Sequence, residues 1–242
     1  MQSVSPQYEA EEKITVNGNV DLYAVVFNRT TETDLTEDQL PQVDIYKYKQ
    51  VIFVGDSRTE FMENVLTGMG ESATKNVKFV CSAGKGLDWF TTTGWAQLYS
   101  IVQHDSNSIL SKKTAVIFNF GVNDLSKSAD YAEYYNWIAP QLKSKGCELY
   151  FMSVNPVNRL MLPNAGRADR SEAAVRSFNQ YRKANLSSAY TYIDMYSYLK
   201  STGYSFASDH YGTGTVDDGL HYTTRTYKRI FAKCMDSLRV PA

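Results

Sequence analysis

Residues 51–58 read Val-Ile-Phe-Val-Gly-Asp-Ser-Arg, four apolar residues followed by a glycine and three polar ones. A short apolar run rich in Val and Ile is typical of a buried strand in a parallel sheet. Apolar residues then recur at helical spacing over 59–66, which predicts a helix. Ser57 is therefore expected at the carboxyl edge of a sheet and at the start of a helix, where ligands collect in open α/β folds.

The rest of the chain continues this alternation of strands and helices. Further strands are predicted at 77–81, 115–120, 148–154 and 191–193, and helices at 129–143, 171–187 and 224–238. Such an alternation favours an α/β fold whose parallel sheet is covered on both faces. We expect this catalytic-type domain to span residues 49–242.

Residues 1–48 have a different pattern and are expected to form an N-terminal extension. Asn17-Gly18 lies between two β-type runs, which predicts a β-hairpin with a tight turn. The hairpin should pack on the main domain, since a lone hairpin is marginally stable in water. Residues 30–41 are polar and acidic and are interpreted as a connecting loop.

Composition excludes several classes of protein. The chain has 242 residues, 43% of them hydrophobic, and a net charge of −1, so no overall field favours nucleic acid. No apolar run reaches the ~18 residues of a membrane helix, so we expect no membrane insertion. The three cysteines, Cys81, Cys147 and Cys234, match no metal motif; free buried thiols are favoured, and a bridge between two of them stays open.

Polar residues follow three of the predicted strands. Ser57 follows the first, Gly84 and Gly86 the second, and Asn123 the third. The carboxyl ends of parallel strands share one edge of a sheet, so these three loops should converge. Each residue also has a structural alternative: the serine as a helix cap, the glycines as turn formers, and the amide as a cap of the next helix.

A serine nucleophile needs a base and a group that orients the base. Of the three histidines, His104 lies in a polar stretch and His210 in a loop, whereas His221 follows Asp218 by three residues. An aspartate at that offset can reach the imidazole Nδ1–H within one turn and leave Nε2 facing outward. Asp218 and His221 are therefore the candidate orienting acid and base for Ser57.

Four blocks occur in order: Gly-Asp-Ser-Arg, a glycine-rich turn, Gly-Val-Asn-Asp and Asp-Gly-Leu-His. Over 49–242 the chain thus resembles the SGNH hydrolases, or GDSL family. The resemblance implies a flavodoxin-like three-layer α/β/α sandwich with a five-stranded parallel sheet, and ester hydrolysis through an acyl-enzyme without cofactor or metal. It implies Ser57 as nucleophile, His221 as base and Asp218 as orienting acid. The Ser57 N–H, the Gly84 N–H and the Asn123 amide would form the oxyanion hole.

Two departures from the family pattern bear on specificity. Arg58 stands where lipase-like members have Leu, and a charge at the site edge suits a polar substrate better than a long acyl chain. Gly84 and Gly86 both qualify for the second block; Gly84 is preferred because it comes first after the strand.

We expect an esterase that removes small acyl groups, acetyl above all, from a carbohydrate or cell-wall polysaccharide. Aromatic and polar residues around the motif loops suit sugar rings, and Arg58, Lys85, Trp89 and Tyr222 are the candidate substrate-binding residues. Three alternatives stay open: a lipase or lysophospholipase, a thioesterase, and a non-catalytic carbohydrate-binding protein on the same fold. A metalloenzyme using Asp209, His210 and Asp217 beside Asp218 is the weakest, because zinc favours more His or Cys ligands.

The expected location rests on the resemblance, since many bacterial relatives are secreted. No signal peptide is visible in the polar and acidic start of the chain. A secreted or cell-surface protein is expected, and a cytoplasmic one stays open.

Overall fold

The computed structural model describes residues 34–43, 48–105, 113–158, 161–162, 169–207 and 218–238. At its centre is a five-stranded sheet in the order β2-β1-β3-β4-β5, and every pair is parallel. The strands are β1 (Tyr48–Gly55), β2 (Val77–Cys81), β3 (Lys113–Asn119), β4 (Cys147–Met152) and β5 (Tyr190–Ile193). The five-stranded parallel sheet predicted from the sequence is confirmed.

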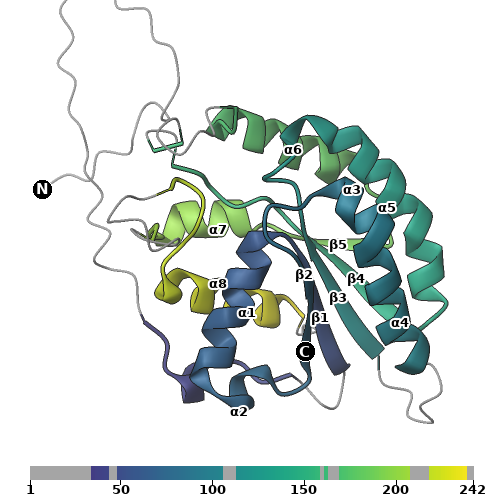
Figure 1. Cartoon of the computed structure of the whole chain (residues 1–242), viewed down its shortest axis with the longest axis horizontal. Coiled ribbons are helices and arrows are strands. Elements are labelled where there is room, and N and C mark those ends of the chain that lie inside the picture. Colours follow the sequence, from purple (N-terminus) through teal and green to yellow (C-terminus); the bar gives the residue numbers. More distant parts are fainter. Residues whose placement is uncertain are drawn as a thin grey trace, which may run out of the picture.

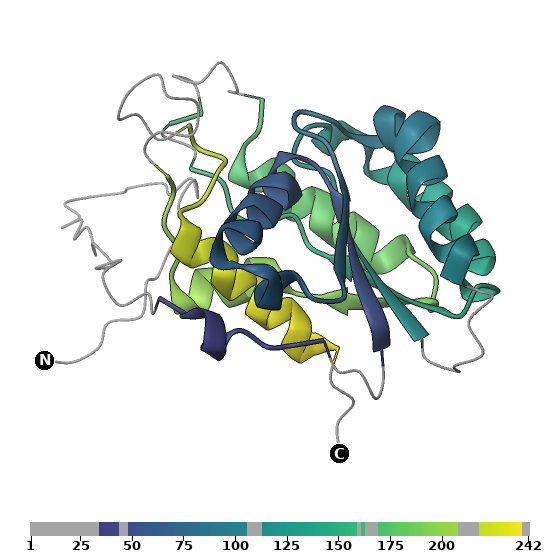
Figure 2. The same cartoon turned by 60° about the horizontal axis from the view of Figure 1, so that its bottom comes forward.

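Helices cover both faces of the sheet (Figures 1 and 2). One face packs against α1 (Ser57–Met69), α2 (Glu71–Thr74), α7 (Met195–Thr202) and α8 (Thr224–Ser237). The other packs against α3 (Leu87–Trp89), the π-helical turn η3 (Phe90–Gly94), α4 (Trp95–Asp105), α5 (Ser128–Lys143) and α6 (Glu172–Asn185). The short 3₁₀ helices η2 (Glu37–Gln39) and η4 (Leu125–Lys127) complete the described elements. The three-layer α/β/α arrangement is confirmed.

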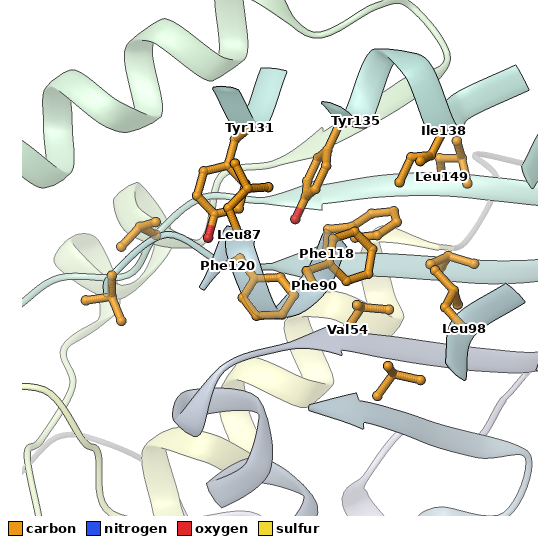
Figure 3. Packing of buried hydrophobic residues seen from close by; sticks show 14 of the residues in the cluster. Val54, Leu87, Phe90, Leu98, Phe118, Phe120, Tyr131, Tyr135, Ile138 and Leu149 are labelled. Carbon is orange, nitrogen blue, oxygen red and sulfur yellow. The ribbon is translucent and has the colours of Figure 1, made fainter. Parts of the chain in front are cut away.

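The place of β1 at the centre of the sheet explains why residues 51–54 are all apolar. Ile52 and Val54 point into the cluster under α3–α6, which Figure 3 shows, while Val51 and Phe53 point into the cluster under α1, α7 and α8. All four side chains are fully buried. Burial of such a side chain contributes roughly 1.5–3 kcal/mol. The segment 51–54, covered on both faces, therefore has no polar position before the strand ends at the site.

Part of the predicted N-terminal extension belongs to the main core. Leu40 and Val43 are buried in the hydrophobic cluster under α1, α7 and α8. Lys228 of α8 forms an ion pair with Asp34 (3.0 Å). Figure 2 shows this purple segment running beside α8. Residues 34–41, predicted to be a connecting loop, contain the 3₁₀ helix η2 and pack Leu40 against the core. The predicted hairpin around Asn17-Gly18 lies outside the described residues.

No helix is predicted from the sequence between Gly86 and His104, where the structure contains α3, η3 and α4. Three consecutive threonines, residues 91–93, weaken the helical signal there and lie in the π-helical turn. His104 is exposed near the end of α4, and its Nδ1 lies 2.6 Å from the Ser100 carbonyl. Among the described residues, no helix is both long and apolar enough to cross a membrane.

Candidate active site

The turn between β1 and α1 presents Ser57 as the first residue of the helix. Asp56 is the N-cap, and its carboxylate accepts the Arg58 backbone N–H (3.0 Å). A Cβ on Gly55 would lie 1.9 Å from the Thr59 Oγ1 and 2.9 Å from the Asn119 carbonyl oxygen. Only glycine therefore lets the strand turn this tightly into the helix. Ser57 itself is 4% exposed.

His221 meets Ser57 from the loop that precedes α8. Its Nε2 lies 2.7 Å from the Ser57 Oγ, and its Nδ1 lies 2.5 Å from the Asp218 Oδ2. A carboxylate can only accept, so Nδ1 bears the proton and Nε2 is left as the acceptor for the serine hydroxyl. The Phe61 ring packs edge-on against the imidazole, 4.5 Å between centroids. The three residues thus form a continuous hydrogen-bonded series of nucleophile, base and acid.

Asp218 is held as a carboxylate by its own turn. Its Oδ1 accepts the backbone N–H groups of Leu220 and His221, each at 2.9 Å. Burial raises the pKa of Asp218, but the hydrogen bond and charge of His221 and these two N–H groups outweigh it. The net result is a pKa held well below the usual range. The carboxylate therefore stays ionised and fixes the tautomer and orientation of the imidazole.

The loops after β2 and β3 are tied to each other. The Asn123 side-chain amide donates to the Lys85 carbonyl (2.8 Å), and the Leu87 N–H donates to the Asp124 carboxylate (2.8 Å). Gly84 occupies the open part of the β2 turn with φ +68°, and a Cβ there would touch nothing within 4 Å. The convergence predicted for these two loops is therefore present at the sheet edge beside β1.

Gly86, the other glycine of this loop, is required for close packing against Asp124. A Cβ on Gly86 would lie 2.3 Å from an oxygen of Asp124, so the residue is selected by packing against that carboxylate. Gly84, with a positive φ and open space beside its Cα, remains the preferred candidate for the oxyanion donor.

Asp124, next to Asn123, could cap the helix that follows the loop after β3, but it has a different structural role. Its carboxylate instead accepts from the Leu87 N–H at the start of α3 and from the Tyr131 hydroxyl (2.7 Å). Burial raises the pKa of Asp124, against the lowering effect of these two hydrogen bonds. It joins the loop after β2 to α5 and thereby supports the position of Asn123.

A family model for GDSL-like lipases and acylhydrolases matches residues 51–234, which include all of these residues. The chain belongs to this family. No curated protein matches the sequence of this GDSL-like hydrolase.

Solved structures share the fold of this hydrolase at low sequence identity. One, a protein of Slackia heliotrinireducens described as an SGNH hydrolase, has a TM-score of 0.54 and 12% identity, over 80% of this chain and 100% of that one. The acetyl xylan esterase AlAXEase has a TM-score of 0.50 and 12% identity, over 78% and 100%. A Parabacteroides merdae protein described as a GDSL-like lipase has a TM-score of 0.52 and 12% identity, over 82% and 100%. They show that the expected SGNH hydrolase fold is present.

Two of the four predicted substrate-binding residues are in the interior of the hydrolase. Arg58 is 2% exposed, and its guanidinium donates three hydrogen bonds to backbone carbonyls, so the expected charge at the site edge is wrong. Tyr222 is 1% exposed, stacks on Phe206 and donates its hydroxyl to the Pro156 carbonyl. Neither side chain is positioned to line a substrate surface.

The other two predicted substrate-binding residues lie on the loop after β2. Lys85 is exposed, whereas Trp89 is half-buried and packs against Phe120 at 6.1 Å between ring centroids. Next to them, the exposed Asp88 carboxylate forms an ion pair with Lys127 (2.8 Å). The described rim of the site on this side is therefore polar and charged.

The remaining sequence predictions concern cysteines and metals. All three cysteines are free thiols: Cys147 and Cys234 are buried, and the half-buried Cys81 donates to Glu63 (3.3 Å). In the described ranges no three His, Cys, Asp or Glu residues gather as a metal site. Asp209, His210 and Asp217 lie outside the described residues.

Proposed function

We propose that this hydrolase cleaves small acyl esters, acetyl esters above all, from a carbohydrate, with Ser57 as nucleophile. The observation that carries the proposal is the series Ser57 Oγ, His221 Nε2 and Nδ1, Asp218 Oδ2, with distances of 2.7 and 2.5 Å. This is the arrangement that activates an otherwise inert hydroxyl.

In the proposed reaction the Ser57 Oγ attacks the ester carbonyl carbon while its proton passes to the His221 Nε2. The oxyanion accepts hydrogen bonds from the Ser57 N–H, the Gly84 N–H and the Asn123 amide. When the intermediate collapses, the C–O bond to the alcohol breaks and His221 returns the proton to the leaving oxygen. A water molecule, deprotonated by His221, then hydrolyses the acyl-enzyme and releases the acid.

Two observations support a small polar substrate. The rim formed by the exposed Lys85 and Asp88 and the half-buried Lys127 is charged, which suits a hydroxylated substrate better than a long acyl chain. The acetyl xylan esterase that shares the fold illustrates that this architecture accommodates such a substrate. Tyr222 and Phe206 pack inside the protein and therefore offer no ring face to a sugar.

The test is a panel of esters. Initial rates on 4-nitrophenyl acetate, butyrate and octanoate are compared, and acetate release is measured from acetylated xylan, mannan, pectin and peptidoglycan. We expect kcat/KM to fall with acyl length and at least one acetylated polymer to release acetate. A kcat/KM that rises steadily with acyl length would favour a lipase or thioesterase instead. Absence of all ester hydrolysis would favour a binding protein.

A further inference from the structure

Arg58 lies next to the candidate nucleophile and is almost completely buried, at 2% exposure. Its guanidinium donates three hydrogen bonds, and each acceptor is a backbone carbonyl. Nε donates to Leu220 (3.0 Å), Nη1 to Asn155 (2.9 Å) and Nη2 to Pro156 (2.9 Å). A guanidinium so far from water is stable only when its donors are satisfied in this way.

The three carbonyls belong to two segments that are distant in sequence and adjacent in the fold. Leu220 immediately precedes His221, whereas Asn155 and Pro156 follow β4 at the carboxyl edge of the sheet. Arg58 itself is the second residue of α1, fixed to the same helical turn as Ser57. One side chain therefore connects the nucleophile turn, the β4 loop and the loop that contains His221.

The Arg58 guanidinium also contacts Tyr222, the residue that follows His221. Its Cζ lies 5.1 Å from the centroid of the Tyr222 ring, and the Tyr222 hydroxyl donates to the Pro156 carbonyl that Arg58 also contacts. The backbone of His221 is thus held at residue 220 by a hydrogen bond and at residue 222 by a cation–π contact.

We propose that Arg58 is a positioning residue, which fixes the His221 loop relative to Ser57 and so sets the distance between Ser57 Oγ and His221 Nε2. The proposal rests on the proposed function, because it assigns Arg58 a part in activating Ser57. Lysine cannot replace it: an ammonium is a single point of charge, whereas the planar guanidinium directs separate donors to three carbonyls at once.

The chain offers a matched control in Arg229 of α8. This arginine is also buried, at 8% exposure, and donates to the carbonyls of Gly203 (2.9 Å) and Thr202 (3.3 Å). It lies against the Tyr198 ring at 5.7 Å. It too is a buried guanidinium that donates to backbone carbonyls, but these acceptors lie at the end of α7 and do not adjoin Ser57 or His221 in sequence.

The experiment compares Arg58→Lys with Arg229→Lys in the full chain, at a temperature where circular dichroism shows both variants folded. Thermal unfolding, kcat and KM on 4-nitrophenyl acetate, and the rate of Ser57 labelling by a serine-directed phosphonate are measured. We expect both variants to lose thermal stability. Only Arg58→Lys should lose kcat, by about 10²-fold, because a displacement near 1 Å costs that much. Its labelling rate should fall in parallel, with KM little changed.

A second variant keeps the test decisive if Arg58→Lys does not fold. Arg58→Ala leaves space for ethylguanidinium, which should restore kcat and labelling in a saturable manner, whereas ethylammonium should not. Equal kcat in folded Arg58→Lys and the wild type would overturn the proposal, as would equal kcat losses in the Arg58→Lys and Arg229→Lys variants. A wild-type protein that neither hydrolyses esters nor is labelled would overturn the proposed function, and the positioning role with it.

Discussion

The Oγ of Ser57 lies 2.7 Å from the Nε2 of His221, although 164 residues separate them in the sequence. The serine comes from the end of β1 and the histidine from the loop before α8. Only the complete sheet, with helices on both faces, brings these two loops together. A substitution that leaves the fold intact but changes this contact should therefore lower the rate, whether or not it also lowers stability.

Ser57→Ala should abolish nearly all turnover, with a loss of about 10³-fold or more in kcat, because it removes the attacking oxygen. The folded state should be retained, since alanine fits the first turn of a helix. Initial rates on 4-nitrophenyl acetate and thermal unfolding test this. Phosphonate labelling followed by peptide mapping should identify Ser57 and no other serine. A folded Ser57→Ala protein with a near-native rate would rule out the nucleophile.

Asp218→Asn should lower kcat strongly, because an amide at this position can hold the wrong imidazole tautomer; the same change costs ~10⁴-fold in serine proteases. A smaller loss is expected if backbone contacts also orient the ring. The acid limb of the kcat/KM profile should move to lower pH, because the carboxylate that favours the imidazolium is gone.

Asp217→Asn is the matched control for that change, one residue farther from His221 in the sequence. It should leave both kcat and the acid limb close to the wild type. If Asp217→Asn lost most of its kcat while Asp218→Asn kept it, the assignment of Asp218 as the acid that orients His221 would be contradicted. If His221→Ala kept native activity, His221 would not be the base, and His210 would be the next candidate to test.

Asn123→Ala should lower kcat by roughly 10²–10³-fold, the usual cost of one oxyanion-hole donor. Steady-state kinetics on an acetyl ester measure it. Asn136→Ala is the control, because the Asn136 amide also donates to a backbone carbonyl, that of Asn185 (2.9 Å), but between α5 and α6. If the two variants lose the same small fraction of kcat, Asn123 is not an oxyanion-hole donor, and its amide only connects the loops after β2 and β3.

Asp56→Asn should change how stability depends on pH. Burial raises the pKa of Asp56 from 3.8 to about 7, although Arg58 acts against it. The folded protein then keeps a proton that the unfolded chain releases. Its contribution to stability is full below pH ~4 and is lost as the pH rises to ~7. Asparagine is neutral throughout and still caps the helix.

The free energy of unfolding of Asp56→Asn, relative to the wild type, should therefore rise between pH 4.5 and 7.5 by on the order of a few kcal/mol. Urea denaturation at several pH values measures it. Asp194→Asn serves as control, since Asp194 is an exposed cap that accepts the Ser197 N–H (3.1 Å). A difference for Asp56→Asn that stays constant with pH would contradict the expectation.

The strands and the local pair Asp218 and His221 were the parts most open to prediction from sequence. The central strands β1 and β3 contain the unbroken apolar runs 51–54 and 115–118, and each predicted strand overlaps an observed one. The aspartate and histidine are three residues apart, and the geometry of one turn suffices to relate them. The helix α4 was missed, although its buried or half-buried positions Trp95, Leu98, Tyr99 and Val102 follow helical spacing.

Arg58 could not be placed from the sequence. A charged residue is expected at the surface unless it is paired, and here its partners are carbonyl groups of residues 155, 156 and 220. Backbone carbonyls leave no signature in side-chain identity, so neither composition nor spacing could reveal them. The prediction of Tyr222 as a substrate-binding residue is wrong for the same reason, because its hydroxyl also donates to a backbone carbonyl.

The strand order has a consequence for synthesis on the ribosome. Strand β1 lies between β2 and β3, so three neighbouring strands and the serine turn can assemble from residues 48–119. The histidine, at 221, emerges after all five strands have been made. A nascent or truncated chain can therefore display a formed nucleophile turn while it is still unable to deprotonate the serine, and hydrolytic competence is acquired only as the last helix docks.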